Sequence, residues 1–118
     1  MTMELDCIFC KIVNKKIPAS ILFENDTVLA FRDIEQKAPE HILVIPKAHV
    51  PSIMEQSLSK DTGIWDAVLD AIQTIAKDLN LDINGFRIVN NMGLHGGQTV
   101  DHLHFHVLGG RQMNWPPG

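Results

Sequence analysis

The sequence predicts an α+β fold in which an antiparallel sheet of about five strands is covered by one long helix. Three observations lead to this prediction. The chain has one long run with amphipathic helical periodicity and several short strand-like runs. Most of the strand-like runs are joined by short turns, as antiparallel strands are. The length of 118 residues, with 45% hydrophobic and 20% charged side chains, fits one globular domain over residues 1–118.

The first half of the chain is expected to carry a short helix and three strands. The helix, or helical turn, covers residues 7–14. Asn25-Asp26 between two apolar runs is typical of a hairpin turn, because both residues tolerate positive φ. The strand-like runs cover residues 21–24, 27–33 and 41–46.

The second half is expected to carry the long helix, over residues 61–81, and two further strands, over residues 86–90 and 102–108. A Gly-rich loop over residues 92–98 separates these strands, and the tail, residues 111–118, should be extended. The apolar positions of the helix recur at three- and four-residue steps, which predicts one buried stripe. Its members are Ile64, Trp65, Val68, Leu69, Ile72, Ile75, Ala76 and Leu79.

Composition excludes several classes of protein. The net charge is −4 without a basic block, so we expect no nucleic-acid partner. The longest apolar runs, such as residues 42–45, have four residues, which predicts no membrane span. The N-terminus is acidic and has no apolar segment typical of a signal peptide, so we expect a cytoplasmic protein. In that reducing compartment, Cys7 and Cys10 favour metal binding or redox chemistry over a disulfide.

Three histidines at alternate positions are the most informative feature of the sequence. In a strand, His102, His104 and His106 point to one face, while the intervening apolar residues point into the core. Three interpretations remain open from this spacing. The imidazoles are hydrogen-bonded or surface residues of a half-exposed strand, they ligate a metal, or one of them is a nucleophile or general base oriented by its neighbours.

The Gly-rich loop before these histidines favours the third interpretation. Gly96-Gly97-Gln98-Thr99 leads directly into the histidine strand. Glycine-rich turns expose backbone N–H groups that hold anions, although such a turn can also simply reverse the chain. A phosphate beside the imidazoles would indicate phosphoryl chemistry at a histidine.

His-x-His-x-His followed by apolar residues is the signature of the histidine triad (HIT) family, which the sequence resembles. The tail resembles the Hint branch, the histidine triad nucleotide-binding proteins. Together the matching segments extend over nearly the whole chain. They are residues 7–12, 17–19 and 29–34, Ala38-Pro39 with His41, residues 44–47 with His49, residues 96–98, and residues 108–118.

The resemblance implies an enzyme that hydrolyses purine nucleoside 5′-phosphoramidates and binds purine mononucleotides, without a cofactor for catalysis. His104 would attack the α-phosphorus and form a nucleotidyl-imidazole intermediate, which water then cleaves. The backbone carbonyl of His102 would accept a hydrogen bond from the nucleophile's second nitrogen. His106 would hydrogen-bond a phosphate oxygen or the leaving group, and His41 would be the fourth active-site histidine.

The same resemblance assigns the nucleotide contacts. Asp33 and the backbone of Ile34 would bind the ribose hydroxyls. The base would lie in an apolar slot. Trp115 in the tail would reach the partner subunit of a homodimer. The phosphate would be surrounded by Asn91, Gly97, Gln98 and Thr99.

Some members of the family carry a Cys-x-x-Cys pair that holds zinc. The corresponding ligands here would be Cys7, Cys10, His49 and His102, a closed set for a structural ion. The alternative is two reduced thiols packed in the N-terminal turn.

Other functions remain open from the sequence. A nucleotide-binding regulatory module with incidental hydrolysis, a dinucleoside polyphosphate hydrolase and a zinc-dependent hydrolase would each use a similar set of residues.

Overall fold

The structure is a computed structural model that describes residues 6–60 and 62–118. Within these residues, five strands form one antiparallel sheet in the order β1-β2-β3-β5-β4. The strands are β1 (Ile21–Glu24), β2 (Val28–Arg32), β3 (Glu40–Pro46), β4 (Phe86–Val89) and β5 (Phe105–Gly109). The helices are α1 (Ile8–Val13), the 3-10 helix η1 (Gln56–Ser59), α2 (Ile64–Asp78), α3 (Leu81–Asn84) and α4 (Gly93–Gly96). The predicted α+β class and antiparallel sheet are confirmed.

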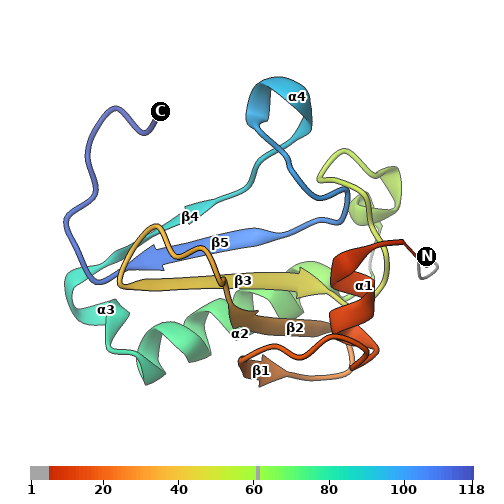
Figure 1. The fold of residues 1–118 in the computed structure, drawn as a ribbon, viewed down its shortest axis with the longest axis horizontal. Coiled ribbons are helices and arrows are strands. Elements are labelled where there is room, and N and C mark those ends of the chain that lie inside the picture. The colour runs from red at the N-terminus through yellow and green to blue at the C-terminus, as the bar shows by residue number, and fades with distance from the viewer. Residues whose placement is uncertain (1–5, 61) are drawn as a thin grey trace.

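Both faces of the central strands are covered. Helix α2 runs along one face, where it packs on β1, β2 and β3, and α1 lies against the other face (Figure 1). Alternate residues of β2 therefore enter different cores: Val28 packs toward α2, and Leu29 packs toward α1 with Phe9. This arrangement explains why β2 and β3 are continuous apolar runs in the sequence.

Strand β5 begins three residues later than predicted, at Phe105 instead of His102. The register pairs Val44 with Phe105, so an extension of β5 to Leu103 would pair that residue with Pro46, which has no N–H to donate. The backbone at positions 102–104 instead bonds outside the sheet. The Leu103 N–H donates to Val50 C=O at 2.6 Å, and the carbonyls of His102 and His104 accept from side chains.

Helix α2 is shorter than the predicted span of residues 61–81. It begins at Ile64, after Gly63 with φ +74°, and ends at Asp78. Asn80 has φ +60° and separates α2 from the short helix α3. The first residue of the expected helix, Asp61, lies outside the described residues. Among the described residues, no helix is long and apolar enough to span a membrane.

The predicted apolar stripe of α2 is partly wrong. Six residues of α2 are buried, but Trp65 is 41% and Leu69 is 55% exposed. Ala71, which was not assigned to the stripe, is fully buried. Helical spacing identified an apolar face that is wider than the part covered by the sheet. The buried residues are Ile64, Val68, Ala71, Ile72, Ile75 and Ala76.

The predicted Gly-rich loop contains one turn of helix, α4, which the sequence analysis did not expect. Gly97 follows with φ +76°, a left-handed conformation that glycine adopts without strain. The Gln98 side chain stabilises this turn: its Oε1 accepts from the Gly93 N–H at 3.0 Å, and its Nε2 donates to the Pro51 carbonyl at 2.8 Å.

Candidate active site

The three alternate histidines share one face of the chain, as predicted, but this face is not open to solvent. His102 and His104 are buried, and only His106 is partly exposed. Helix α1 covers them, and the Phe9 ring makes edge-to-face contacts with both, its centroid 5.8 Å from that of His102 and 5.2 Å from that of His104. The interpretation of these residues as surface histidines of a half-exposed strand is therefore wrong for two of the three.

The protonation of His104 follows from its hydrogen bond. Its Nδ1 lies 2.7 Å from the backbone oxygen of His102, which can only accept, so Nδ1 carries the hydrogen. In a neutral imidazole, Nε2 then has a free lone pair, as a nucleophile requires. Asn90 Nδ2 donates to the His104 carbonyl at 2.9 Å and fixes the backbone around the ring.

His104 and His106 line a pocket of about 370 Å³ between α1, the segment that precedes β1, and strands β2, β3 and β5. Its volume falls within the range of small-molecule sites. Asp33, Ile34 and Thr99, which the sequence analysis assigned to nucleotide binding, line the same pocket. The remaining lining is mainly apolar and includes Ile8, Phe9, Ile12, Ile17, Phe31, Leu43 and Val100. The pocket therefore combines polar groups with an apolar surface large enough to contact a flat apolar group.

His41 lies directly behind His106. The register places both residues on the face of the sheet opposite α2, and His41 Nε2 is 2.8 Å from His106 Nδ1. Asp33 Oδ2 is 3.5 Å from the same His41 nitrogen. His41 therefore joins the pocket through His106, and it does not line the pocket itself.

Burial favours the neutral form of His106, which lines the pocket, and of His41 behind it. It lowers the pKa of His106 to about 4, assisted by the neighbouring rings of His104 and His41, while Asp33 opposes this shift. Burial also lowers the pKa of His41 from its usual value. A neutral imidazole offers one donor and one acceptor, so each of these rings has a defined tautomer.

Other residues assigned to the nucleotide lie outside the pocket lining. Asn91 Nδ2 donates to the Gly96 carbonyl at 2.6 Å, and the Gln98 amide accepts from the Gly93 N–H and donates to the carbonyls of Pro51 and Val100, so both side chains stabilise this loop. Gly97 follows α4 in the same loop. Trp115 is 82% exposed, and the structure does not bring it to the pocket of its own chain.

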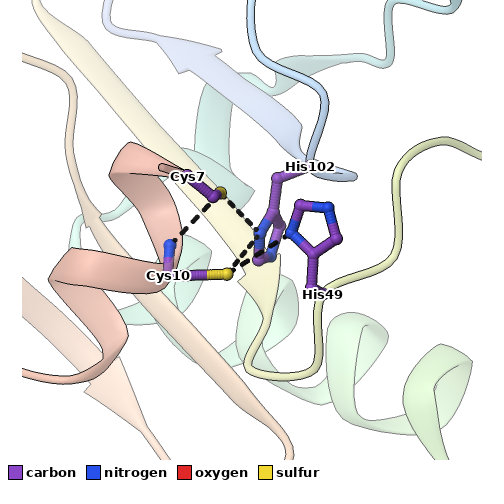
Figure 2. Close-up of side chains that lie close together, drawn as sticks. All are labelled: Cys7, Cys10, His49 and His102. Carbon is purple, nitrogen blue, oxygen red and sulfur yellow. Dashed lines mark hydrogen bonds between the residues drawn. The ribbon is translucent and has the colours of Figure 1, made fainter. Parts of the chain in front are cut away.

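A second cluster lies on the other side of His102. Figure 2 shows Cys7, which caps the N-terminus of α1, and Cys10 of α1 facing the rings of His49 and His102. The two sulfurs and the two Nδ1 atoms all lie within 4.8 Å of one another. Cys7 Sγ is 3.3 Å from His102 Nδ1, and Cys10 Sγ is 3.3 Å from His49 Nδ1 and 3.6 Å from His102 Nδ1.

These separations fit a zinc ion. Tetrahedral zinc with ordinary Zn–S and Zn–N bonds separates a sulfur from a nitrogen ligand by about 3.5 Å. His102 Nε2 donates to the Pro46 carbonyl at 2.8 Å, which leaves the His102 Nδ1 lone pair directed at the cysteines. Two thiolates and two imidazoles would form a closed structural site, and His104 is not among its ligands.

Three further residues, which the sequence patterns did not indicate, orient the histidines. Asn90 holds the His104 carbonyl, Pro46 holds His102 Nε2, and the Lys37 N–H donates to His41 Nδ1 at 3.0 Å. Two of these contacts use backbone atoms, which side-chain patterns do not reveal. Asn90 stands at the end of a strand, where a polar residue is unremarkable, so no sequence signal distinguished it.

The HIT domain family matches residues 14–113, which include the pocket histidines and all five strands of the sheet. The chain belongs to the HIT family. A HIT family hydrolase from Legionella pneumophila has a similar solved structure, with a TM-score of 0.90 and 44% identity over 96% of this chain and 100% of that chain.

Curated HIT relatives are similar along almost the whole chain. An uncharacterised HIT-like protein of Synechococcus elongatus is 46% identical over 98% of this chain and 100% of its own. A 14 kDa zinc-binding protein of Brassica juncea is 46% identical over 96% of this chain and 100% of its own. Adenylylsulfatase HINT1 of Arabidopsis thaliana is 46% identical over 94% of this chain and 76% of its own.

Proposed function

We propose that this HIT protein hydrolyses purine nucleoside 5′-phosphoramidates, with His104 as the nucleophile. The observation that carries the proposal is the 2.7 Å hydrogen bond from His104 Nδ1 to the His102 carbonyl. In the neutral imidazole this bond places the hydrogen on Nδ1, so the lone pair is on Nε2 of a residue that lines the pocket. The relatives named as hydrolases support a hydrolytic reaction.

The reaction proceeds in two displacements. His104 Nε2 attacks the α-phosphorus, the P–N bond breaks with its electron pair on nitrogen, and the departing amine takes a proton from solvent. Water then attacks the same phosphorus, the P–Nε2 bond breaks, and a water proton returns to solvent. The products are a free amine and a nucleoside 5′-monophosphate, and the imidazole is regenerated. Splitting the reaction in this way lowers each barrier.

The pocket supports a nucleotide as the group that is transferred. Asp33 carries the carboxylate for the ribose hydroxyls, and it lines the pocket beside His106. The apolar lining around Phe9 and Phe31 provides a slot for the base, which fits purines without hydrogen-bond selection. Thr99 and the loop that contains Asn91, Gly97 and Gln98 would contact the phosphate.

The leaving group is a separate part of the proposal. The relative from Arabidopsis thaliana is named an adenylylsulfatase, so adenylyl sulfate is a second candidate substrate. Both compounds would transfer the same adenylyl group to His104 and differ only in the group that departs. We propose the phosphoramidate as the better substrate and use adenylyl sulfate as the comparison.

We further propose that the cluster of Cys7, Cys10, His49 and His102 holds a structural zinc ion. The matching ligand separations support this assignment, and the relative from Brassica juncea is named a zinc-binding protein. When bound, the ion would stabilise the docking of α1 against the histidine face.

A homodimer is also part of the proposal. β4 is an edge strand, and Ile88 pairs with Val107, so its side chain points to the face of the sheet on which α2 packs. Ile88 is 49% and Phe86 is 36% exposed there, and the exposed Trp65 and Leu69 of α2 lie on the same side of the molecule. A second copy would bury this apolar surface, which a monomer leaves in water. Trp115 would then approach the partner's pocket.

Intact-mass spectrometry after rapid mixing with an adenosine phosphoramidate tests the proposal. We expect a transient mass increase of one adenylyl group in the wild-type protein and none in His104→Ala. His95→Ala is the matched control, because His95 is an exposed histidine outside the pocket. It should form the adduct at the wild-type rate.

Other outcomes identify the alternatives. Turnover without an adduct would indicate direct attack by water. Bound nucleotide without turnover would indicate a nucleotide-binding regulatory module. Faster turnover of a diadenosine polyphosphate than of the phosphoramidate would identify a dinucleoside polyphosphate hydrolase. Loss of activity on chelation at a temperature where the protein stays folded would indicate a zinc-dependent hydrolase.

A further inference from the structure

A chain of hydrogen bonds connects the C-terminal tail to the pocket. Arg111 Nη2 donates to the Lys37 carbonyl at 3.0 Å, and the Lys37 N–H donates to His41 Nδ1 at 3.0 Å. His41 Nε2 then lies 2.8 Å from His106 Nδ1. His106 lines the pocket. Arg111, Lys37, His41 and His106 are therefore connected by consecutive hydrogen bonds, which we call the relay.

The direction of this relay follows from which atoms can donate. A backbone N–H only donates, so His41 Nδ1 must be the acceptor, and the hydrogen of a neutral His41 is on Nε2. That hydrogen is directed at His106 Nδ1, which must therefore be unprotonated. The hydrogen of a neutral His106 is then on Nε2, for which no partner is found among residues 6–60 and 62–118.

Asp33 provides a second, independent indication of the same tautomer. Its Oδ2 lies 3.5 Å from His41 Nε2. A carboxylate only accepts, so both neighbours of this nitrogen, Asp33 Oδ2 and His106 Nδ1, are satisfied when Nε2 carries the hydrogen. With the hydrogen on Nδ1 instead, His41 would place two donors against each other at Lys37 and a lone pair against the carboxylate.

The loop that supplies the Lys37 N–H is braced by the tail. Gly110 has φ +91°, and a Cβ at this position would lie 2.9 Å from Cβ of Pro39 and 3.6 Å from the Glu40 nitrogen. The tail backbone therefore packs directly on the end of the loop, and the Arg111 bond to Lys37 follows one residue later. Both contacts stabilise the position of the loop, residues 33–39, relative to His41.

We propose that the Lys37 backbone N–H, braced by Gly110 and Arg111, sets the tautomers of His41 and His106 and makes His106 Nε2–H a fixed hydrogen-bond donor in the pocket. Lys37 and Arg111 are positioning residues, since they act through His41. The role of the donor rests on the proposed function: Nε2–H would bond a phosphoryl oxygen of the nucleotide. The opposite tautomer would present a lone pair to that negatively charged oxygen.

Imidazole ¹⁵N NMR of the full-length protein, recorded without substrate, reads these tautomers directly. In the wild-type protein we expect the hydrogen on Nε2 of both His41 and His106. Lys37→Pro removes the only hydrogen-bond donor of the backbone at this position, and both rings should become mixtures of tautomers. Lys37→Ala is the matched control, because it keeps the N–H and should keep the Nε2–H tautomers. Arg111→Ala should give a tautomer mixture in both rings that is intermediate between those of Lys37→Ala and Lys37→Pro.

Hydrolysis of the adenosine phosphoramidate provides the second readout. We expect kcat/KM of Lys37→Pro to fall about tenfold relative to Lys37→Ala, the size of one lost hydrogen bond. A hydrogen on Nδ1 of either ring in the wild-type protein would overturn the proposal, even where Lys37→Pro fails to fold. Unchanged tautomers in a folded Lys37→Pro would overturn it as well. Because the spectra need no substrate, correct tautomers without any hydrolysis would refute the proposed function alone.

Discussion

His102 serves two neighbours through two different groups. Its ring directs Nδ1 at Cys7 and Cys10, and its backbone carbonyl accepts a hydrogen bond from His104 Nδ1–H. The Cys/His cluster and the proposed nucleophile are therefore adjacent but separate, because His104 contributes no atom to the cluster. A zinc ion held there would stabilise the site without taking part in the proposed displacement.

At the scale of single residues, the titration of His106 predicts how stability depends on pH. Burial lowers its pKa from the usual 6.5 to about 4. Between these values the unfolded chain binds a proton that the folded protein does not, so stability rises with pH through this window and falls on acidification. In His106→Asn this contribution is absent, while the amide oxygen can still accept from His41 Nε2–H.

We therefore expect the melting temperature to fall less between pH 7 and pH 5 in His106→Asn than in the wild-type protein. Scanning calorimetry at these two pH values measures the difference. His95→Asn, at an exposed position, should retain the wild-type pH dependence. Equal slopes for His106→Asn and the wild-type protein would contradict the assigned titration.

A second prediction at this scale concerns the ribose. If Asp33 bonds both hydroxyls, the wild-type protein should prefer a ribonucleoside phosphoramidate over its 2′-deoxy analogue by about tenfold or more in kcat/KM. Asp33→Asn should reduce this preference, and its side-chain oxygen can still accept from the Glu35 N–H. Asp82→Asn on α3 is the control. A preference unchanged in Asp33→Asn would remove Asp33 from the ribose site.

The site could be predicted from sequence only where side-chain patterns carry the information. Alternation correctly placed His102, His104 and His106 opposite Phe105 and Val107. It could not show that α1 buries two of these histidines, because that contact depends on residues 95 positions apart. Nor could it reveal the hydrogen bond from Lys37, since a backbone N–H is present at every residue except proline.

At the scale of elements, boundaries were less predictable than element types. The helix α2 and all five strands lie where periodicity indicated them. The start of β5 was misplaced because it depends on the partner strand, which ends at Pro46. The exposed positions of α2 were misjudged because Trp65 and Leu69 continue the apolar pattern beyond the sheet that covers the helix.

Helix α1 leads to a prediction about metal removal. It has only six residues, and an isolated helix of this length is not stable in water. Its position depends on Phe9 and Ile12 in the core and on Cys7 and Cys10 in the cluster. We expect one zinc ion per chain, and we expect Cys10→Ser to lose it and to lower the melting temperature by about 5 °C or more.

Elemental analysis and calorimetry together measure this effect. Chelation of the wild-type protein should reproduce the melting temperature of Cys10→Ser. His104→Ala is the control, because it should lose the adduct but keep its zinc. A zinc content of Cys10→Ser equal to that of the wild-type protein would show that the ion is not bound by this cluster.

At the scale of the whole molecule, the two edges of the sheet differ. β1 and β4 are both edge strands, but β4 carries Phe86 and Ile88 exposed on the side of α2. A charge at the centre of an apolar interface costs several kcal/mol when it is buried without a partner. Ile88→Glu should therefore raise the dimer dissociation constant about 100-fold or more. Ile21→Glu on β1 is the matched control, since Ile21 is 38% exposed at the opposite edge.

Sedimentation equilibrium measures the dimer dissociation constant of both variants. An activity assay then tests whether the pocket depends on the dimer. If Trp115 of the tail completes the partner's site, monomeric Ile88→Glu should lose kcat/KM by about the same factor as Trp115→Ala in the dimer. The two substitutions together should then cost no more than either alone, because both remove the same contact. An Ile88→Glu protein that remains dimeric would place the interface elsewhere, and a monomer with full activity would show that each pocket is complete within one chain.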